Sequence, residues 1–294
     1  MIVGGGGYIG RRLGAALRRE GAAVQELSSR DGTGIDPDTG VFAAPPEVPR
    51  GVNAVVYLAQ SPHHRQAPEK AAHLLSVNVV SAVAVAAAAA ESGARKFLYA
   101  STGNIYSPAF TALAESSPLR RDNWYALSKI HAEEALALFR DRMDVTVARL
   151  FGVYGPAQTQ RLVPDLVETV ASGRSVILEP RSGEGADTGG LRISLCYVDD
   201  IVHILRSLLD ASGVPVVNVA GEEALSVRDI ASAIALRLGV EPRFALSQQR
   251  RAFDLIANVS RLKSLLAPRF VPFAEGIART LQDRPAAASP ARDR

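Results

Sequence analysis

The chain has 294 residues, of which 47% are hydrophobic, enough for a large buried core and an additional lobe. Its 33 basic and 30 acidic residues leave a net charge of only +3, which is too small to indicate a nucleic-acid-binding protein. A single cysteine, Cys196, excludes an internal disulfide. No cluster of metal ligands and no signal segment stands out, so we expect a cytoplasmic protein that binds neither a metal nor a membrane.

The first predicted unit is a short strand at Ile2-Val3, a glycine turn, and a helix from Arg11 to Arg19. The turn fits both G-x-G-x-x-G and G-x-x-G-x-x-G, so its spacing does not choose a subtype of dinucleotide fold. Missing side chains let the backbone approach a pyrophosphate, which then sits at the positive end of the helix. The predicted cofactor-binding residues in this unit are Gly4, Gly7, Tyr8, Ile9 and Gly10.

A second strand is predicted between Ala22 and Arg30, and its end bears on the choice of dinucleotide. An NAD enzyme usually places an acidic residue there, against the ribose hydroxyl of the adenosine. Ser28 and Ser29 stand at this place, and hydroxyls followed by Arg30 can accept a 2′-phosphate instead. The sequence therefore favours NADP(H), with NAD possible, and Asp36 is a candidate adenine contact.

Further predicted elements alternate strand and helix, as expected for a doubly wound parallel sheet of the α/β class. Strands are predicted at residues 54–59, 96–100 and 145–150, and a helix at 74–92. The alanine-rich stretch from Val77 to Ala90 contains Asn78 and Ser81, which favours a buried helix over a membrane span. Thr102 follows the strand at 96–100, and ligands bind at such strand ends.

Tyr125 and Lys129 stand four residues apart in Asn123-Trp-Tyr-Ala-Leu-Ser-Lys129. Residues at this spacing lie on one face of a helix, so the ammonium can sit beside the phenol and favour its ionised form. The pair alone is a weak signal, because an exposed helix face often carries both residue types. Downstream of a glycine turn, it indicates proton transfer in redox chemistry, with Thr102 placing the substrate oxygen that Tyr125 protonates.

Four more segments follow in order: Tyr57-Leu-Ala-Gln60, Ser101-Thr102-Gly-Asn-Ile-Tyr106, Arg149-Leu-Phe-Gly-Val-Tyr-Gly-Pro156 and Tyr197-Val-Asp-Asp-Ile201. Together with the glycine turn and the Tyr-Lys helix, they cover nearly the whole chain. The chain resembles an extended short-chain dehydrogenase/reductase of the NAD-dependent epimerase/dehydratase family, whose best-known members act on nucleotide sugars.

The resemblance implies a Rossmann-type doubly wound parallel sheet and a role for each matching residue. Thr102, Tyr125 and Lys129 would form the catalytic triad, with Lys129 also holding the nicotinamide ribose. The remaining implied contacts are Leu58, Ala59 and Gln60 to the cofactor, Asn104 to the substrate, and Arg192 and Arg251 to a substrate diphosphate.

Three functions are compatible with these motifs, and a fourth, dehydration, is not. Gly103 and Asn104 follow Thr102 where nucleotide-sugar 4,6-dehydratases carry an acidic pair, so we do not expect dehydration. The Ser28-Ser29-Arg30 segment favours NADP(H), and a net reductase exchanges its cofactor and commonly uses NADPH. We therefore expect an NADPH-dependent ketoreductase of a nucleotide-linked 4-keto-sugar. The alternative is an NAD-dependent nucleotide-sugar 4-epimerase. A third reading is a dinucleotide-binding sensor without turnover, but such relatives usually lack the Tyr and the Lys.

The predicted organisation has a dinucleotide-binding domain at residues 1–153 and a smaller, mainly substrate-binding C-terminal lobe at residues 154–282. The resemblance implies that segments near residues 191–220 return to the first domain. It also implies a homodimer, formed through the helix at residues 82–90 and the Tyr125 helix. Residues 283–294, rich in Ala, Pro, Arg and Asp, are predicted to be a disordered tail.

Overall fold

The computed structural model describes residues 1–183 and 187–282, so the predicted tail at 283–294 lies outside the described residues. Its largest element is a parallel sheet of six strands in the order β2-β1-β3-β4-β5-β9. These strands are β1 (Ile2–Val3), β2 (Glu26–Leu27), β3 (Ala54–Tyr57), β4 (Lys96–Thr102), β5 (Asp144–Leu150) and β9 (Val216–Val219). The chain leaves β1 for β2 on one side and returns to β3 on the other. This is the topological switch point at which doubly wound sheets bind ligands.

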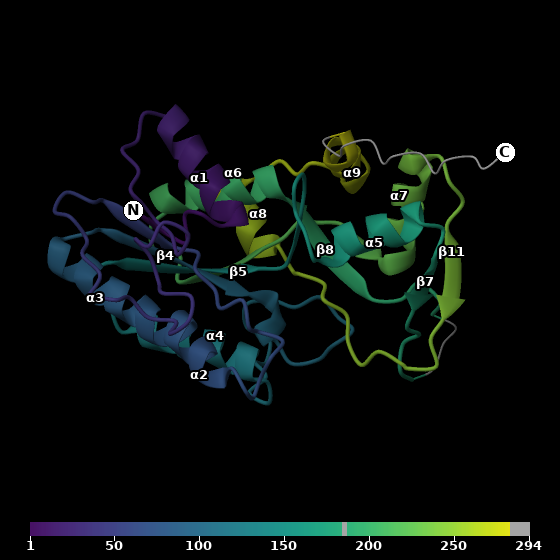
Figure 1. Cartoon of the computed structure of the whole chain (residues 1–294), viewed down its shortest axis with the longest axis horizontal. Helices are drawn as coiled ribbons and strands as arrows, with labels where there is room; N and C mark the ends of the chain where they lie inside the picture. Colours follow the sequence, from purple (N-terminus) through teal and green to yellow (C-terminus); the bar gives the residue numbers. More distant parts are fainter. Residues whose placement is uncertain (184–186, 283–294) are drawn as a thin grey trace.

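Both faces of this sheet are covered by helices, as Figure 1 shows for α1 and α6 on one face and α3 and α4 on the other. Alternate strand residues enter the two cores: Val56 and Leu98 pack with α1 and α6, and Val55 and Phe97 pack with α3 and α4. Burial on both faces explains why these strands are continuous apolar runs. The helices are α1 (Tyr8–Arg19), α3 (Ser81–Ser92), α4 (Trp124–Ala137) and α6 (Val198–Asp210).

The helix predicted at residues 74–92 starts earlier and is not regular. It runs through α2 (Ala71–Leu75), a π-helical turn at Ser76–Val80, and α3. Tyr57 and Tyr99 on the sheet donate hydroxyl hydrogen bonds to the carbonyl oxygens of Val77 and Asn78, inside that turn. The run is long and apolar enough to cross a membrane, yet half of its most apolar window is buried in this fold, with Val85 fully enclosed.

A smaller lobe, at the right of Figure 1, holds two further sheets and three helices around a core of its own. Its elements are β6 (Gly152–Tyr154), α5 (Leu162–Ala171), β7 (Ser175–Leu178), β8 (Arg192–Tyr197), β10 (Ala224–Ser226), α7 (Val227–Leu238), β11 (Arg243–Leu246) and α9 (Phe273–Gln282). Between β8 and β10 the chain returns to the large sheet, where α6 packs on α1 and β9 pairs with β5. Later in the chain, α8 (Ser260–Leu266) packs against β9. A 3-10 turn, Gly103–Ile105, follows β4.

Candidate active site

The glycine turn brings three chain segments together without room for side chains. Gly4 has a φ of +85°, and a Cβ added to it would lie 2.7 Å from the backbone nitrogen of Ala59. Gly10 packs against the Gly4 carbonyl oxygen inside α1, which begins at Tyr8 with Gly7 as an N-cap that offers no side-chain hydrogen bond. The first amides of α1 are therefore left for a ligand, and this cradle fits a dinucleotide pyrophosphate.

A cavity of about 700 Å³ opens above this turn, at the carboxyl ends of the parallel strands and against the lobe. Gly4, Gly7, Tyr8, Ile9 and Gly10 line it, as do Leu58 and Gln60 after β3. Ala59 lies between them with its backbone against Gly4. The lobe closes the cavity with residues 157–163, Ile193 and Leu195.

Tyr125 stands near the start of α4, where Asn123 caps the helix by accepting a hydrogen bond from the Ala126 amide. Its hydroxyl donates to the Gln60 side chain, with 3.1 Å between Oη and Oε1. Burial raises the pKa of Tyr125 to about 12, against a smaller lowering effect of the Thr102 hydroxyl. The phenol is therefore protonated at neutral pH and is suited to act as an acid.

Lys129 lies one turn further along α4 and is 1% exposed. Its ammonium donates to the Ala100 carbonyl oxygen at 2.9 Å and lies 4.7 Å from the centre of the Tyr99 ring. Burial lowers the pKa of Lys129 to about 7, and the Glu133 carboxylate offsets part of this effect. In this arrangement the ammonium is directed toward β4, and burial has the largest effect on the pKa of Tyr125, so the influence of Lys129 on the ionisation of Tyr125 stays a prediction.

Thr102 ends β4, and its hydroxyl accepts hydrogen bonds from the backbone and side-chain nitrogens of Asn104, at 3.2 and 3.3 Å. A second cavity of about 190 Å³ begins beside these residues. It shares Asn104, Tyr125, His64 and Leu255 with the larger cavity, so Tyr125 stands where the two spaces meet. A substrate in the smaller cavity would present one group to this phenol.

The residues after β2 are divided between the cavity and the loop. Arg30 lines the cavity, whereas Ser29 is exposed and does not line it. The buried Ser28 hydroxyl accepts a hydrogen bond from the Arg30 amide and lies against Gly6. Asp36 also stays outside the cavity, because its carboxylate accepts hydrogen bonds from the amides of residues 38 and 39 and from a hydroxyl within its own turn.

Neither arginine predicted to bind a diphosphate lines the cavity. Ile193 and Leu195 of β8 face it, and since neighbours in a strand point to opposite faces, the exposed Arg192 side chain points away. Arg251 is 5% exposed, and its guanidinium already donates to Asp187 and Asp254. The structure brings neither residue to the cavity, and the substrate-binding role of both stays a prediction.

Other residues that line the cavity were not singled out from the sequence, among them His64, Arg65 and Leu255. Arg161 also lines it and acts on the pKa of Tyr125. Alternation along β8 is a signal that would have identified Ile193 and Leu195 in place of Arg192. No comparable pattern marks His64 or Arg65, which lie on the loop after β3.

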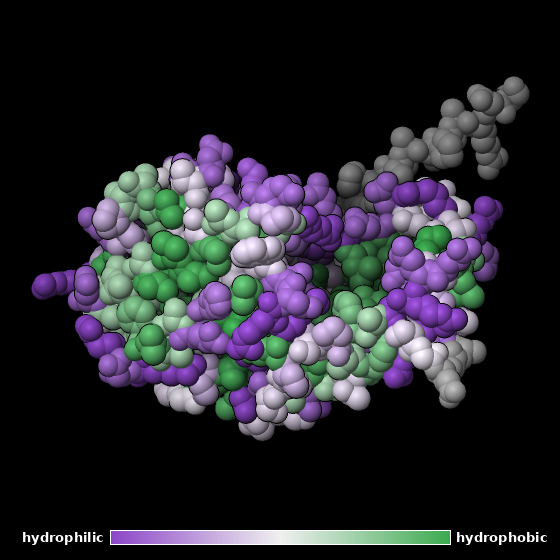
Figure 2. Space-filling view, turned by 90° about the horizontal axis from the view of Figure 1, so that it is seen from below, coloured by the Kyte–Doolittle hydropathy of each residue, from purple (hydrophilic) through white to green (hydrophobic). Residues whose placement is uncertain are grey.

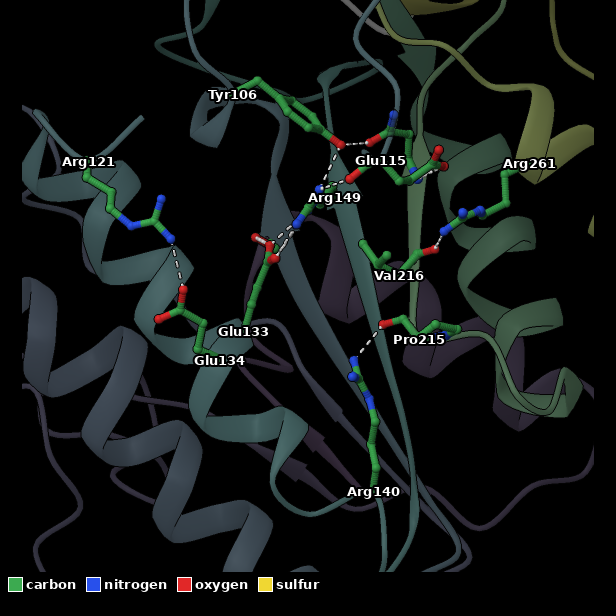
Figure 3. Close-up of polar contacts among 12 residues, drawn as sticks. Tyr106, Glu115, Arg121, Glu133, Glu134, Arg140, Arg149, Pro215, Val216 and Arg261 are labelled. Atoms are coloured by element: carbon green, nitrogen blue, oxygen red, sulfur yellow. Dashed lines mark hydrogen bonds and ion pairs between the residues drawn. The ribbon is translucent and has the colours of Figure 1, made fainter. Parts of the chain in front are cut away.

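A buried polar network lies behind the site and is drawn in Figure 3. Arg149 on β5 points toward Glu133 on α4, and it also donates to the Tyr106 hydroxyl at 3.0 Å. Ser101, the neighbour of Thr102, donates to the same Glu133 carboxylate. The network therefore ties together the two elements that carry Thr102 and Tyr125.

A doubly wound parallel sheet with a glycine turn at its switch point defines a dinucleotide-binding α/β protein. The sequence model of the family described as "NAD dependent epimerase/dehydratase family" matches residues 1–220, and the chain belongs to this family. Its members are NAD-dependent epimerases, dehydratases and reductases, and the matched relatives are named for nucleotide-sugar substrates.

Relatives that the chain matches differ in the reaction for which they are named. The chain is 30% identical to a UDP-glucose 4-epimerase of Mycolicibacterium smegmatis, over 70% of this chain and 68% of the relative. It is 24% identical to a dTDP-4-dehydro-6-deoxy-D-allose reductase of Streptomyces bikiniensis, over 95% and 94%. Among solved structures, TunA, an NAD-dependent NDP-hexosamine 5,6-dehydratase involved in tunicamycin biosynthesis, has a TM-score of 0.77 at 25% identity, over 96% and 95%.

Proposed function

We propose that this protein reduces the keto group of a nucleotide-linked 4-keto-sugar, with Tyr125 as the proton donor. The observation that carries the proposal is the Tyr125 hydroxyl, which stands where a dinucleotide-sized cavity meets a smaller one and is protonated at neutral pH. Reduction of a ketone needs an acid at the oxygen, whereas oxidation of an alcohol needs a base. The protonated phenol of Tyr125 can supply that proton.

Each residue of the triad has a separate task in this scheme. A bound nicotinamide dinucleotide supplies the hydride. Tyr125 donates its proton to the carbonyl oxygen, and the Thr102 hydroxyl positions that oxygen. Lys129, fixed between the Ala100 carbonyl and the Tyr99 ring, is a candidate to hold the nicotinamide ribose at the cavity wall.

The charges at the large cavity support an anionic substrate and an anionic cofactor. Arg65 from the large domain and Arg161 from the lobe both line it, as does Arg11 near the glycine turn. A guanidinium is well suited to a diphosphate because its planar fork binds phosphate oxygens bidentately. The reductase of S. bikiniensis, which the chain matches over nearly its whole length, supports a 4-keto-sugar as the substrate class.

We propose NADPH as the cofactor because Arg30 lines the cavity just beyond β2, where it can meet a 2′-phosphate. NAD is the alternative, since the family description names it. The second candidate function is a nucleotide-sugar 4-epimerase with NAD. The 30% identity to the UDP-glucose 4-epimerase of M. smegmatis favours this candidate.

We further propose that the protein forms a homodimer through α3 and α4. Figure 2 shows a hydrophobic area on the face that α3 and α4 cover. Val80, which precedes α3, is 55% exposed, and Val83, Ala84 and Ala87 of α3 are partly exposed. Light scattering after gel filtration tests this proposal, and a monomeric protein at micromolar concentration would contradict it.

The direct test of the function is Tyr125→Phe, which keeps the ring and removes the acid. The assay follows NADPH and NADH oxidation with dTDP-4-keto-6-deoxyglucose as the probe. Turnover should fall about 10²–10⁴-fold, the usual contribution of a positioned acid, while dinucleotide affinity stays unchanged. The matched control is Tyr154→Phe, which removes a hydroxyl from the core of the lobe. Near-normal turnover of Tyr125→Phe would refute the proposal, and NAD-dependent interconversion of UDP-glucose and UDP-galactose would establish the epimerase instead.

A further inference from the structure

His64 lies where the two cavities meet and lines both of them. Its ring centre is 5.5 Å from that of Tyr125, with 49° between the ring planes. The two side chains come from different elements, His64 from the loop after β3 and Tyr125 from α4. A ligand that reaches the Tyr125 hydroxyl therefore also passes the His64 ring.

Hydrogen bonds fix the loop that carries His64. The fully buried Ser61 hydroxyl bonds to Nδ1 of His73 at 2.8 Å and accepts the His63 amide at 3.2 Å. The second ring nitrogen of His73 bonds to the Pro37 carbonyl oxygen at 3.0 Å. Together with the hydrogen bond from the Gln66 amide to the His63 carbonyl oxygen, these contacts anchor the backbone on both sides of His64.

The His64 imidazole is neutral at neutral pH. Burial lowers its pKa from the usual histidine value, and the positive charges of Arg161 and Arg65 lower it further. Its Nδ1 atom is sealed from solvent and makes no hydrogen bond of good geometry to the described residues, although the carbonyls of Pro62 and Ser61 lie near enough to act on the ring. We assign the ring proton to Nδ1, because this atom is sealed from solvent and the Pro62 and Ser61 carbonyls are the acceptors that act on the ring. Nε2 is then the hydrogen-bond acceptor of a ring that lines both cavities.

We propose that His64 is a specificity-determining residue that accepts a hydrogen bond, at Nε2, from a sugar hydroxyl next to the carbon on which Tyr125 acts. The inference rests on the proposed function. Its basis is spacing, because two side chains with rings 5.5 Å apart can each bond one of two neighbouring oxygens on a sugar ring. Such a contact discriminates well between substrates, since an analogue without the hydroxyl leaves a buried polar atom unpaired.

The test compares the affinity for a nucleotide sugar with the affinity for the free nucleotide, and so isolates the contribution of the sugar. Calorimetric titration measures the affinity of the dinucleotide-loaded protein for UDP and UDP-glucose, and for dTDP and dTDP-glucose. The variant His64→Phe keeps a ring beside Tyr125 and removes the acceptor, and His64→Gln restores a polar group. The matched control is His63→Phe, because His63 packs on His73 and lines neither cavity.

We expect His64→Phe to bind the nucleotide sugar about tenfold more weakly, as for one lost hydrogen bond, with unchanged affinity for the free nucleotide. His64→Gln should recover part of the loss, and His63→Phe should match the wild type. Equal weakening for sugar and nucleotide, or no weakening, would overturn the role of His64 while leaving the proposed function intact. A wild-type protein that binds none of the four ligands would overturn both.

Discussion

Arg149 donates three hydrogen bonds to the Glu133 carboxylate, from Nε to both oxygens at 3.2 Å and from a terminal nitrogen to Oε2 at 2.6 Å. The side chains are 7% and 10% exposed, so this ion pair is buried between β5 and α4. Glu133 also lies one turn from Lys129 and acts on its pKa. The pair therefore joins the stability of the fold to the electrostatics of the site.

Replacing Arg149 by Met should destabilise the protein by about 3–5 kcal/mol, because it leaves the buried Glu133 carboxylate without its partner. Urea unfolding at neutral pH measures this free energy. The control is Arg174→Met, since Arg174 and Glu168 are 60% and 73% exposed and such a pair contributes about 1 kcal/mol or less. Similar losses of unfolding free energy in the two variants would show that the buried pair stabilises the protein no more than an exposed pair does.

The pKa of Lys129, lowered to about 7 by burial, predicts a pH-dependent stability of the protein without cofactor. Above pH 7 the folded state releases this proton while the unfolded state keeps it until near pH 10, so the unfolding free energy rises with pH. Lys129→Met lacks this contribution. Its stability relative to the wild type should therefore be greatest at pH 6.5 and fall by about 2 kcal/mol by pH 9. Parallel stability curves for the two proteins would contradict the shifted pKa.

Gly10→Ala should damage both the fold and the cofactor site. The added Cβ would meet the Gly4 carbonyl oxygen and lie 2.9 Å from the Gly5 Cα, and these backbone atoms cannot rotate away. We expect a loss of about 1–3 kcal/mol in unfolding free energy, together with weaker dinucleotide binding. Gly14→Ala is the control in the same helix, because its Cβ would meet the movable end of the Glu26 side chain. If Gly10→Ala binds dinucleotide like the wild type, the close packing of Gly10 on the Gly4–Gly5 backbone is not required for cofactor binding.

Arg30→Gln should weaken NADPH binding by about tenfold, because it removes one charge-assisted hydrogen bond partner of the 2′-phosphate. The affinity for NADH, which lacks that phosphate, should not change. Fluorescence titrations of the wild type and of Arg30→Gln with NADPH and with NADH measure these affinities directly. A wild-type protein that prefers NADH would remove the argument for NADPH and support the epimerase.

The sequence by itself determined the order and type of the elements that build the large sheet. The glycine turn, the apolar strands and the Tyr125–Lys129 spacing are local patterns, and a local pattern fixes which residues share a helix face or end a strand. The Rossmann-type fold and the family were predicted correctly on this basis. The second strand was predicted too long, since only Glu26–Leu27 pair with β1.

Only the tertiary structure decided which charged and polar groups reach the cavities. A shift of one residue along a strand turns a side chain to the other face, so Ile193 faces the cavity and Arg192 does not. Arg251 is held by Asp187, 64 positions away in the chain, and the loop after β3 brings His64 beside Tyr125. Such pairings depend on how distant segments pack, and no periodicity in the sequence records them.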